Sequence, residues 1–446
     1  LTRSISSTGD RRKWTWSGWL KRSALSTNYI MSSNNGSSQY SMLQFDSTDV
    51  LRWYDYTSDF QSHLKTNRKF RDTNAWYHIV VTYDSAQATA ADRVKVYVNG
   101  TQETSFGTSN YPSQDYDSFM NLSGVPHYIG RETGTSNLYD GVMSHVHFTD
   151  GYAYAASDFG STDSTTGEWK INTSPSVSYG TNGYFMFKDD NSVNDDSGNG
   201  NNFTLTAGTL TKTEDNPSNI FCTMNPLQHP DSSITSTFAN GNTSMSGNNS
   251  HWQRAYGTIA AKSTGKWYYE WKATATSSDN NRVGWDSIDL INEGTDSYYS
   301  GLTIDGAGEL RGGVRGHSGY SPDTQMTAIS GGNFSFGTND FLGMAIDLDN
   351  QTISVYKNGT LEINAYSYSG ASNCSILKSR GHFIAPSVNF HSTSGNANTS
   401  SFNFGNGAFG STQLTGTTYT DSNSQGVFKY QPPTNYLAWC TKNLNV

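Results

Sequence analysis

The sequence predicts an all-β protein made of two antiparallel β-sandwiches in tandem. The chain has 446 residues, which is long enough for two or three domains that each bury a full core. Only 15% of the residues are charged, whereas 13% are aromatic and 43 are glycine. This composition favours short strands joined by polar turns. No stretch keeps the apolar period of a helix, so we expect no long amphipathic helix.

Residues 340–359, DFLGMAIDLDNQTISVYKNG, carry the clearest strand pattern. Apolar side chains alternate in the first half, at Leu342, Met344, Ile346 and Leu348. The turn residues Asp349 and Asn350 follow, and a second alternation ends in an Asn-Gly pair. Alternation between such turns predicts an antiparallel hairpin with one buried face. A near-copy of its second half, DRVKVYVNG at residues 92–100, predicts the centre of a separate β domain.

The first part of the chain, residues 10–160, contains five strand-like pieces in a fixed order. They are WTWSGWLKRS, AWYHIVVTYDS, DRVKVYVNG, HYIGR and YDGVMSHVHFTDGYAY. Their order and spacing resemble the laminin G-like, concanavalin A-like jelly roll. A strand like that at residues 184–190, with the DSGNGN turn after it, opens many such domains, whereas here it closes the domain. The resemblance therefore implies a circularly permuted jelly roll, whose last strand returns beside its first because the termini of such sandwiches lie close together.

The second part of the chain contains the pieces GKWYYEWKA, RVGW, DFLGMAIDLDNQTISVYKNG and FIAPSVNF in this order. They resemble a SPRY domain. SPRY domains bind through variable loops, so this resemblance transfers no binding residues. The expected organisation is a laminin G-like jelly roll at residues 1–210, a linker at 211–231, a SPRY-like sandwich at 232–410 and an extended C-terminal tail at 411–446.

Two further segments carry a resemblance to a class of proteins. The tail contains PPTNYLAWC, and residues 157–169 read SDFGSTDSTTGEW. Together with the two domains, they resemble structural proteins of tailed bacteriophages, especially marine, cyanophage-like ones. The resemblance implies a non-enzymatic virion protein on the particle exterior, a capsid decoration or fibre subunit, made in the host bacterial cytoplasm.

The partners that this resemblance implies are other virion proteins of the capsid or fibre. A homo-oligomer is expected, and a trimer is suggested by analogy with fibres alone. The alternative function is that of a receptor-binding, lectin-like tail fibre protein, whose partner would be a host-surface glycan.

Net charge narrows the classes of partner, and the cysteines bear on disulfide and zinc sites. The formal net charge of -9 argues against nucleic acid or an anionic membrane as the main partner. No apolar run is long enough to cross a bilayer. The three cysteines, Cys222, Cys374 and Cys440, are far apart and predict neither a disulfide framework nor a zinc site. Because the sequence starts at Leu1 rather than Met, we expect a processed product or the ordered part of something longer.

Candidate ligand contacts come from aromatic clusters, because sandwich scaffolds place binding groups in loops and exposed rings can stack on the C–H faces of sugars. The candidates in the first domain are Trp53, Tyr54, Asp55 and Tyr56. The candidates in the second domain are Tyr298, Tyr299, Arg315 and Tyr320. The alternative for each is ordinary sheet packing, since a chain so rich in aromatic residues contains such clusters without function.

One carboxylate-rich segment is a candidate calcium site, formed by Asp189, Asp190, Asp195 and Asp196. Carboxylate oxygens suit this hard cation. The alternative is a polar turn in which these side chains bond to their own backbone. His145 and His147 share a strand face and could bind a metal, or could simply pack on that face. No other cofactor is expected.

Catalytic chemistry is not expected from the sequence. Concanavalin A-like glycoside hydrolases use two carboxylic acids across the sugar, and no Glu-x-Asp-x-x-Glu arrangement occurs. Glu270 lies between aromatic residues of a strong strand, which favours a structural role. The chain also has no Gly-x-Ser-x-Gly, P-loop or dinucleotide-binding motif. We therefore expect a protein that is not an enzyme.

Overall fold

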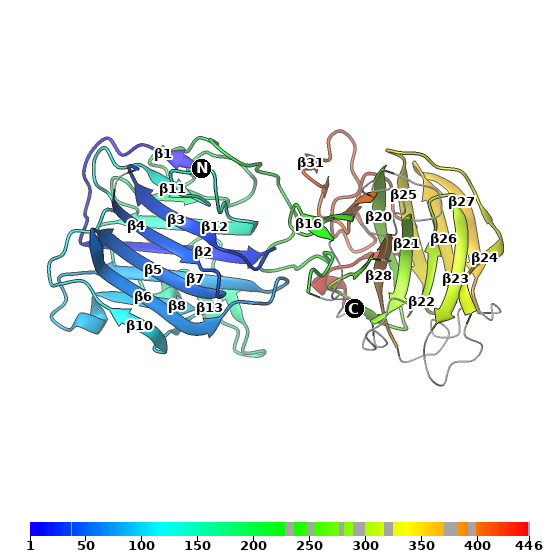
Figure 1. Ribbon diagram of the computed structural model, residues 1–446, viewed down its shortest axis with the longest axis horizontal. Coiled ribbons are helices and arrows are strands. Elements are labelled where there is room, and N and C mark those ends of the chain that lie inside the picture. Colours follow the sequence, from blue (N-terminus) through cyan, green and yellow to red (C-terminus); the bar gives the residue numbers. More distant parts are fainter. Residues whose placement is uncertain are drawn as a thin grey trace. The chain divides into compact units, whose positions relative to one another are not determined.

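The computed structural model describes residues 1–36, 38–227, 236–247, 253–275, 281–288, 299–315, 324–369, 382–390 and 398–444. The chain divides into two compact units, Leu1–Leu210 (unit 1) and Thr211–Val446 (unit 2), each built from β-sheets (Figure 1). The helical segments described are short 3-10 turns, η1 (Ala90–Asp92), η2 (Ala156–Asp158) and η6 (Thr441–Asn443). None of the described helices is long and apolar enough to span a membrane. The predicted all-β, antiparallel fold class is confirmed.

Unit 1 is a sandwich of two antiparallel sheets. The larger has the strand order β1 (Thr2–Arg3), β11 (His127–Ile129), β3 (Asn28–Asn34), β4 (Gln39–Phe45), β5 (Val50–Thr57), β6 (Asp59–Lys69) and β10 (Phe106–Asn110). The smaller has the order β15 (Tyr184–Met186), β12 (Gly141–Asp150), β2 (Lys13–Arg22), β7 (Trp76–Asp84), β8 (Val94–Val98) and β9 (Thr101–Gln102). A separate hairpin pairs β13 (Gly160–Thr162) with β14 (Trp169–Ile171).

The core of unit 1 lies between its two sheets because side chains alternate between the faces of each strand. Trp14 of β2 meets Trp53 of β5 edge to face, with ring centroids 5.0 Å apart. On its other side, Trp14 stacks on Tyr83 of β7 at 4.9 Å. All three rings are buried, so one tryptophan joins the two sheets.

The outer face of the smaller sheet is covered by the chain itself. Ala156 and Phe159 pack on Val80 of β7, and Trp169 of β14 lies against the same cluster. The indole N–H of Trp169 donates to Nδ1 of His78 at 3.0 Å. His78 therefore carries its proton on Nε2, which lies 2.9 Å from Oγ of Ser17.

Both ends of unit 1 meet at one place. Thr2 forms an isolated antiparallel bridge with Thr204, and the amide N–H groups of both residues donate to the other's carbonyl oxygen at 2.9 Å. The closing strand β15 pairs with β12, which pairs with β2. Thr204 therefore lies beside Thr2 of β1, whereas β15 is separated from β2 by β12. The circular permutation stays a prediction.

Unit 2 is a second sandwich. Its larger sheet has the order β16 (Thr237–Ala239), β17 (Ser244–Gly247), β29 (Asn398–Asn403), β20 (Lys266–Ala275), β25 (Phe341–Asp347), β26 (Thr352–Lys357) and β27 (Thr360–Ser367), with β32 (Leu437–Ala438) parallel to β20. The other sheet has the order β18 (Gln253–Tyr256), β28 (Phe383–Phe390), β21 (Asn281–Ser287), β22 (Tyr299–Ile304), β23 (Glu309–Arg315) and β24 (Thr324–Asn333), with β19 (Ala261–Lys262) beside β28. A short hairpin pairs β30 (Ala408–Phe409) with β31 (Thr412–Gln413).

The predicted hairpin at residues 340–359 is formed by β25 and β26 in unit 2. Ile346 pairs with Ile353 and Met344 pairs with Val355. All four side chains are fully buried, because they occupy the inward row of both strands. The hairpin therefore supplies the centre of the unit 2 core.

The two ends of unit 2 pack on its larger sheet. Phe221, from the stretch predicted as a linker, bridges to Cys440 in the predicted tail, and both are buried with Tyr268 of β20. Glu270 of β20 accepts hydrogen bonds from the backbone N–H groups of Lys429 and Tyr430, at 3.0 and 2.8 Å. Both stretches belong to unit 2 as far as they are described, and Glu270 holds the tail in place.

Candidate functional site

Strand β5 carries the four candidate residues of unit 1, and its alternation divides them. Trp53 and Asp55 point inward, with exposed fractions of 1% and 0%. A hydroxyl of Ser41 donates to Asp55 inside the sandwich. Tyr54 and Tyr56 point to the outer face of the larger sheet, where Tyr56 is half-buried. The burial of Trp53 and Asp55 leaves the two tyrosines as the pair that can contribute to a surface.

The outward side chains of three neighbouring strands, β4, β5 and β6, form cross-strand rows. Tyr40, Tyr56 and Phe60 are directly opposite one another in one row. Tyr54 and His63 are opposite each other in the next row. These five rings, together with the side chain of Arg52, are called the aromatic face; their members are Tyr40, Tyr54, Tyr56, Phe60, His63 and Arg52. Figure 1 shows β4, β5 and β6 side by side in this sheet.

The rings of the aromatic face are in mutual contact. Tyr40 and Tyr56 are stacked with centroids 5.1 Å apart, and Phe60 and His63 are stacked at 4.4 Å. Tyr54 lies edge-on to Phe60 at 5.7 Å, with an interplanar angle of 84°. Only 7% of Tyr54 is exposed, whereas the other rings are half-buried. Tyr54 thus lies beneath the other rings, which are partly exposed to solvent.

Arg52 fixes the arrangement of these rings. Its guanidinium carbon lies 4.4 Å from the ring centroid of Tyr54 and 5.2 Å from that of Phe60, which is the range of a cation–π contact. Its Nε–H donates to Nε2 of His63 at 2.8 Å. Nε2 must therefore be unprotonated, and the neutral imidazole carries its proton on Nδ1. Burial first, and then the charge of Arg52, lowers the pKa of His63 to about 4.

The polar groups of the face have defined roles. The hydroxyl of Tyr54 donates to Oε1 of Gln44 at 3.2 Å, and burial raises its pKa well above the ordinary value. The hydroxyl of Tyr56 donates to the carbonyl oxygen of Ser58 at 3.1 Å. Burial, and then the charge of the nearby Glu132, raises the pKa of Tyr29 on the adjoining strand β3. The face thus combines exposed ring area with a guanidinium and phenolic hydroxyls.

The candidate residues of unit 2 fall at the limit of what is described. Tyr299 and Arg315 are directly opposite each other in β22 and β23, and their side chains lie outside the described part of the structure. Tyr298 and Tyr320 also lie outside the described residues. These four remain predictions.

The carboxylate-rich segment of unit 1 forms a hydrogen-bonded turn. Asp195 accepts from the backbone N–H groups of Phe185 and Asn201, at 2.8 and 2.9 Å. Asp190 accepts from the N–H of Ser192 at 2.7 Å. These bonds form the polar turn that was the alternative to calcium binding, and calcium binding by Asp189, Asp190, Asp195 and Asp196 stays a prediction. Among the described residues, no group of three or more His, Cys, Asp or Glu side chains is arranged to hold a metal ion.

The two strand histidines and Asp55 lie in the interior of unit 1. His145 and His147 have exposed fractions of 8% and 2%, with ring centroids 6.4 Å apart. His147 Nδ1 lies 2.9 Å from the hydroxyl of Tyr179. Burial lowers the pKa of His145 to about 4 and raises the pKa of Asp55 to about 7. Both histidines are therefore neutral, packed side chains.

Four members of the aromatic face were not among the sequence candidates: Tyr40, Arg52, Phe60 and His63. Phe60 and His63 are three positions apart, so simple alternation places them on opposite faces. A register shift separates the pairs Tyr56–Phe60 and Asp55–Ser62. The extra residue, Gln61, is a bulge that turns His63 to the same face as Phe60. These residues could be assigned to the face only from the register of β4 with β5 and of β5 with β6.

A family model described as the concanavalin A-like lectin/glucanases superfamily matches residues 3–158. This match confirms the laminin G-like, concanavalin A-like part of the predicted fold in unit 1. It covers the whole aromatic face. No curated protein matches the chain.

Several solved structures are similar to parts of the chain. The SPRY domain of human HERC1 is 14% identical, with 40% of this chain and 96% of that chain covered and a TM-score of 0.29. A putative carbohydrate binding protein from Bacteroides ovatus is 17% identical, with coverages of 42% and 53% and a TM-score of 0.28. Domains LG4-5 of the mouse laminin alpha1 chain are 9% identical, with coverages of 90% and 84% and a TM-score of 0.27.

Proposed function

We propose that this chain is a non-enzymatic carbohydrate-binding protein carried on the exterior of a tailed-phage particle, as a capsid decoration or fibre subunit. Its aromatic face is the surface that contacts sugar. The observation that carries this proposal is the set of partly exposed rings that contact one another around Arg52 on the outer face of β4, β5 and β6.

The chemistry of the face fits a glycan. Ring faces carry partial negative charge and attract the polarised C–H groups of a sugar ring. Arg52 and the phenolic hydroxyls add polar groups beside the rings, and such groups fix the orientation of a ligand. The contacts among the rings hold them in place before binding, so little conformational entropy is lost when a ligand arrives.

A binding role rather than a catalytic one is also supported by the burial of two carboxyl groups, those of Asp55 and Glu270. Asp55 is buried in the core of unit 1, and Glu270 is buried against the tail of unit 2. A retaining or inverting glycosidase needs two carboxyl groups that flank the scissile bond. Both groups are fully buried, so neither is accessible to a bound sugar.

The position on a phage particle rests on the sequence resemblance of the two domains, residues 157–169 and the tail. Averaged electron density of intact particles tests it through location and stoichiometry. We expect density either at lattice points of the capsid or along a projecting fibre. Absence of the chain from purified particles would refute the virion proposal and leave the sugar-binding proposal standing.

Sugar binding is tested on a glycan array with the full chain and the variants Y56A and F60A. We expect the wild type to bind a subset of glycans and both variants to lose most of the signal. Y152A is the matched control, because Tyr152 is 41% exposed and lies outside the aromatic face. Equal binding by F60A and the wild type would contradict the proposed site.

A further inference from the structure

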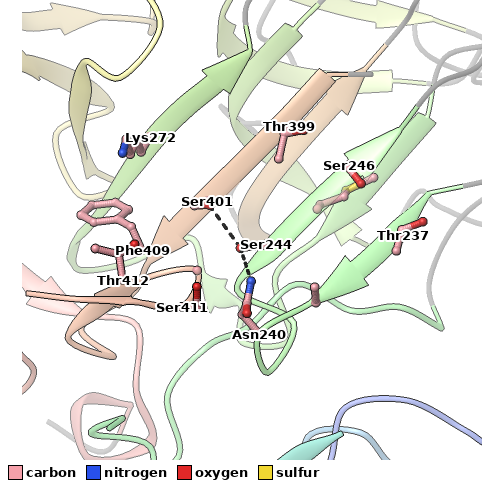
Figure 2. Close-up of a pocket in the computed structure, with 13 residues that line it drawn as sticks. Thr237, Asn240, Ser244, Ser246, Lys272, Thr399, Ser401, Phe409, Ser411 and Thr412 are labelled. Atoms are coloured by element: carbon pink, nitrogen blue, oxygen red, sulfur yellow. Dashed lines mark hydrogen bonds between the residues drawn. The ribbon is translucent and has the colours of Figure 1, made fainter. Parts of the chain in front are cut away.

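Unit 2 has a pocket of about 320 Å³ on its larger sheet, and all the residues that line it belong to unit 2 (Figure 2). Its floor is made by β16, β17, β29 and β20, and its wall is the hairpin of β30 and β31. The inward residue Trp271 of β20 belongs to the core, so the next residue, Lys272, points to the outer face. The tail covers this face at Tyr268, and the pocket lies farther along the strand at Lys272.

Hydroxyl groups line the floor in two adjacent cross-strand rows. One row consists of Lys272, Ser401 and Ser244, which are directly opposite one another in β20, β29 and β17. The other row consists of Thr399, Ser246 and Thr237 in β29, β17 and β16. Because the side-chain period of a strand is two, both rows face the same side.

The hydroxyls of the first row are linked by hydrogen bonds. Nδ2 of Asn240 donates to Oγ of Ser244 at 3.2 Å, and this oxygen lies 3.2 Å from Oγ of Ser401. The two serines hold two hydroxyl protons between them, and their mutual bond uses one. The second proton is available to an acceptor in the pocket. Gly410 of the wall lies so close that a Cβ there would be 3.0 Å from Oγ of Ser244.

The charge at the pocket is positive. Lys272 is half-buried, and its Nζ lies 5.3 Å from the ring centroid of Phe341. The residues described as lining the pocket include no aspartate or glutamate. An ammonium group and an available hydroxyl proton are both donors, so the pocket favours a ligand rich in acceptors and disfavours a cation.

We propose that this pocket binds an acidic monosaccharide unit, with its carboxylate at Lys272 and its ring hydroxyls on the two rows of serine and threonine. The hydroxyls of the rows can both donate and accept, as the hydroxyls of a sugar do. The volume is at the lower end of the range of ligand sites, which suits one sugar unit. This site is independent of the proposed function of unit 1.

The test is a titration of the full chain with D-glucuronate, in which binding is measured by saturation-transfer NMR. D-glucose is the neutral comparison, and acetate is the comparison that lacks hydroxyls. An ammonium–carboxylate pair at a partly exposed site is worth up to about 1 kcal/mol, so we expect K272Q to weaken glucuronate binding by up to about fivefold. S401A is expected to weaken glucuronate and to leave acetate unchanged.

The matched control is K429Q, because Nζ of Lys429 lies 4.8 Å from the same ring of Phe341 and Lys429 does not line the pocket. We expect K429Q and F60A to bind glucuronate as the wild type does. No binding of glucuronate, equal binding of acetate, or equal binding of glucose would overturn the proposal. Loss of glucuronate binding in F60A would place the acidic sugar on the aromatic face instead, and would equally overturn it.

Discussion

Arg52 is the residue on which the geometry of the aromatic face depends, and the variant R52M tests that dependence. Methionine keeps the length and the apolar stem of the side chain but has no guanidinium. The variant therefore loses the contacts to Tyr54 and Phe60 and the hydrogen bond to His63. No ring residue is replaced in this variant, so the change isolates the contribution of the cation.

The magnitude follows from three contacts. Each cation–π contact at a partly exposed site contributes about 0.5 to 1 kcal/mol, and the hydrogen bond contributes about 1 kcal/mol. Sulfur–aromatic contacts of the new methionine offset part of this loss. We expect the free energy of unfolding of unit 1 to fall by about 1 to 2 kcal/mol. We also expect the pKa of His63 to rise from about 4 toward its ordinary 6.5, because the charge of Arg52 is one cause of its depression.

Both effects are measurable in the full chain. The pKa of His63 is read from the pH titration of its ring C–H resonances by NMR. The stability change is read from hydrogen exchange of the amides of β5 and β6. R68M is the matched control, since Arg68 lies on β6 and pairs with Glu103. If the pKa of His63 in R52M stayed at about 4, the assigned contact between Arg52 and His63 would be refuted.

Three further predictions concern the two sandwiches. E270A leaves the three N–H donors to Glu270 unpaired and is expected to destabilise unit 2 by about 3 to 5 kcal/mol, with faster exchange of the Tyr430 amide; unchanged exchange there would contradict it. Burial lowers the pKa of His78 and of His127 to about 3, so the folded chain binds fewer protons than the unfolded chain below pH 6.5. Between pH 7 and pH 4.5, this pair therefore lowers the free energy of unfolding of unit 1 by about 5 kcal/mol. Asp55 acts in the opposite direction, because its pKa of about 7 makes the folded chain bind a proton first and raises the free energy of unfolding by about 3 kcal/mol over the same pH range. Calorimetry that showed unit 1 to be more stable at pH 4.5 than at pH 7 would contradict this balance. D195A is expected to lower the free energy of unfolding by about 2 to 3 kcal/mol through its lost backbone hydrogen bonds, and EDTA is expected to leave the Tm of the wild type unchanged. A Tm raised by added calcium would instead support the calcium site.

The fold could be predicted from the sequence because it depends on local alternation. Leu342, Met344 and Ile346 fill one inward row of β25, as their spacing indicates. The same alternation separates Trp53 and Asp55 from Tyr54 and Tyr56, although it does not say which pair points outward. Burial depends on the opposite sheet, and that sheet is distant in sequence.

The aromatic face and the position of the tail could not be predicted because they depend on long-range pairing. Tyr40 joins Tyr56 only through the register of β4 with β5, and His63 joins Phe60 only through a bulge. Glu270 receives its donors from residues 429 and 430, about 160 positions away. No local pattern in the sequence signals these contacts.

The most direct test of the central claim is the affinity of F60A for the glycan that the wild type binds best on an array. Phe60 contacts Tyr54, Tyr56 and His63 and supports Arg52, so its removal takes away stacking area and loosens the guanidinium. The account predicts that F60A remains folded and loses most of its affinity, while Y152A keeps it. An F60A variant that is folded and binds the glycan as tightly as the wild type would contradict the assignment of sugar binding to the aromatic face.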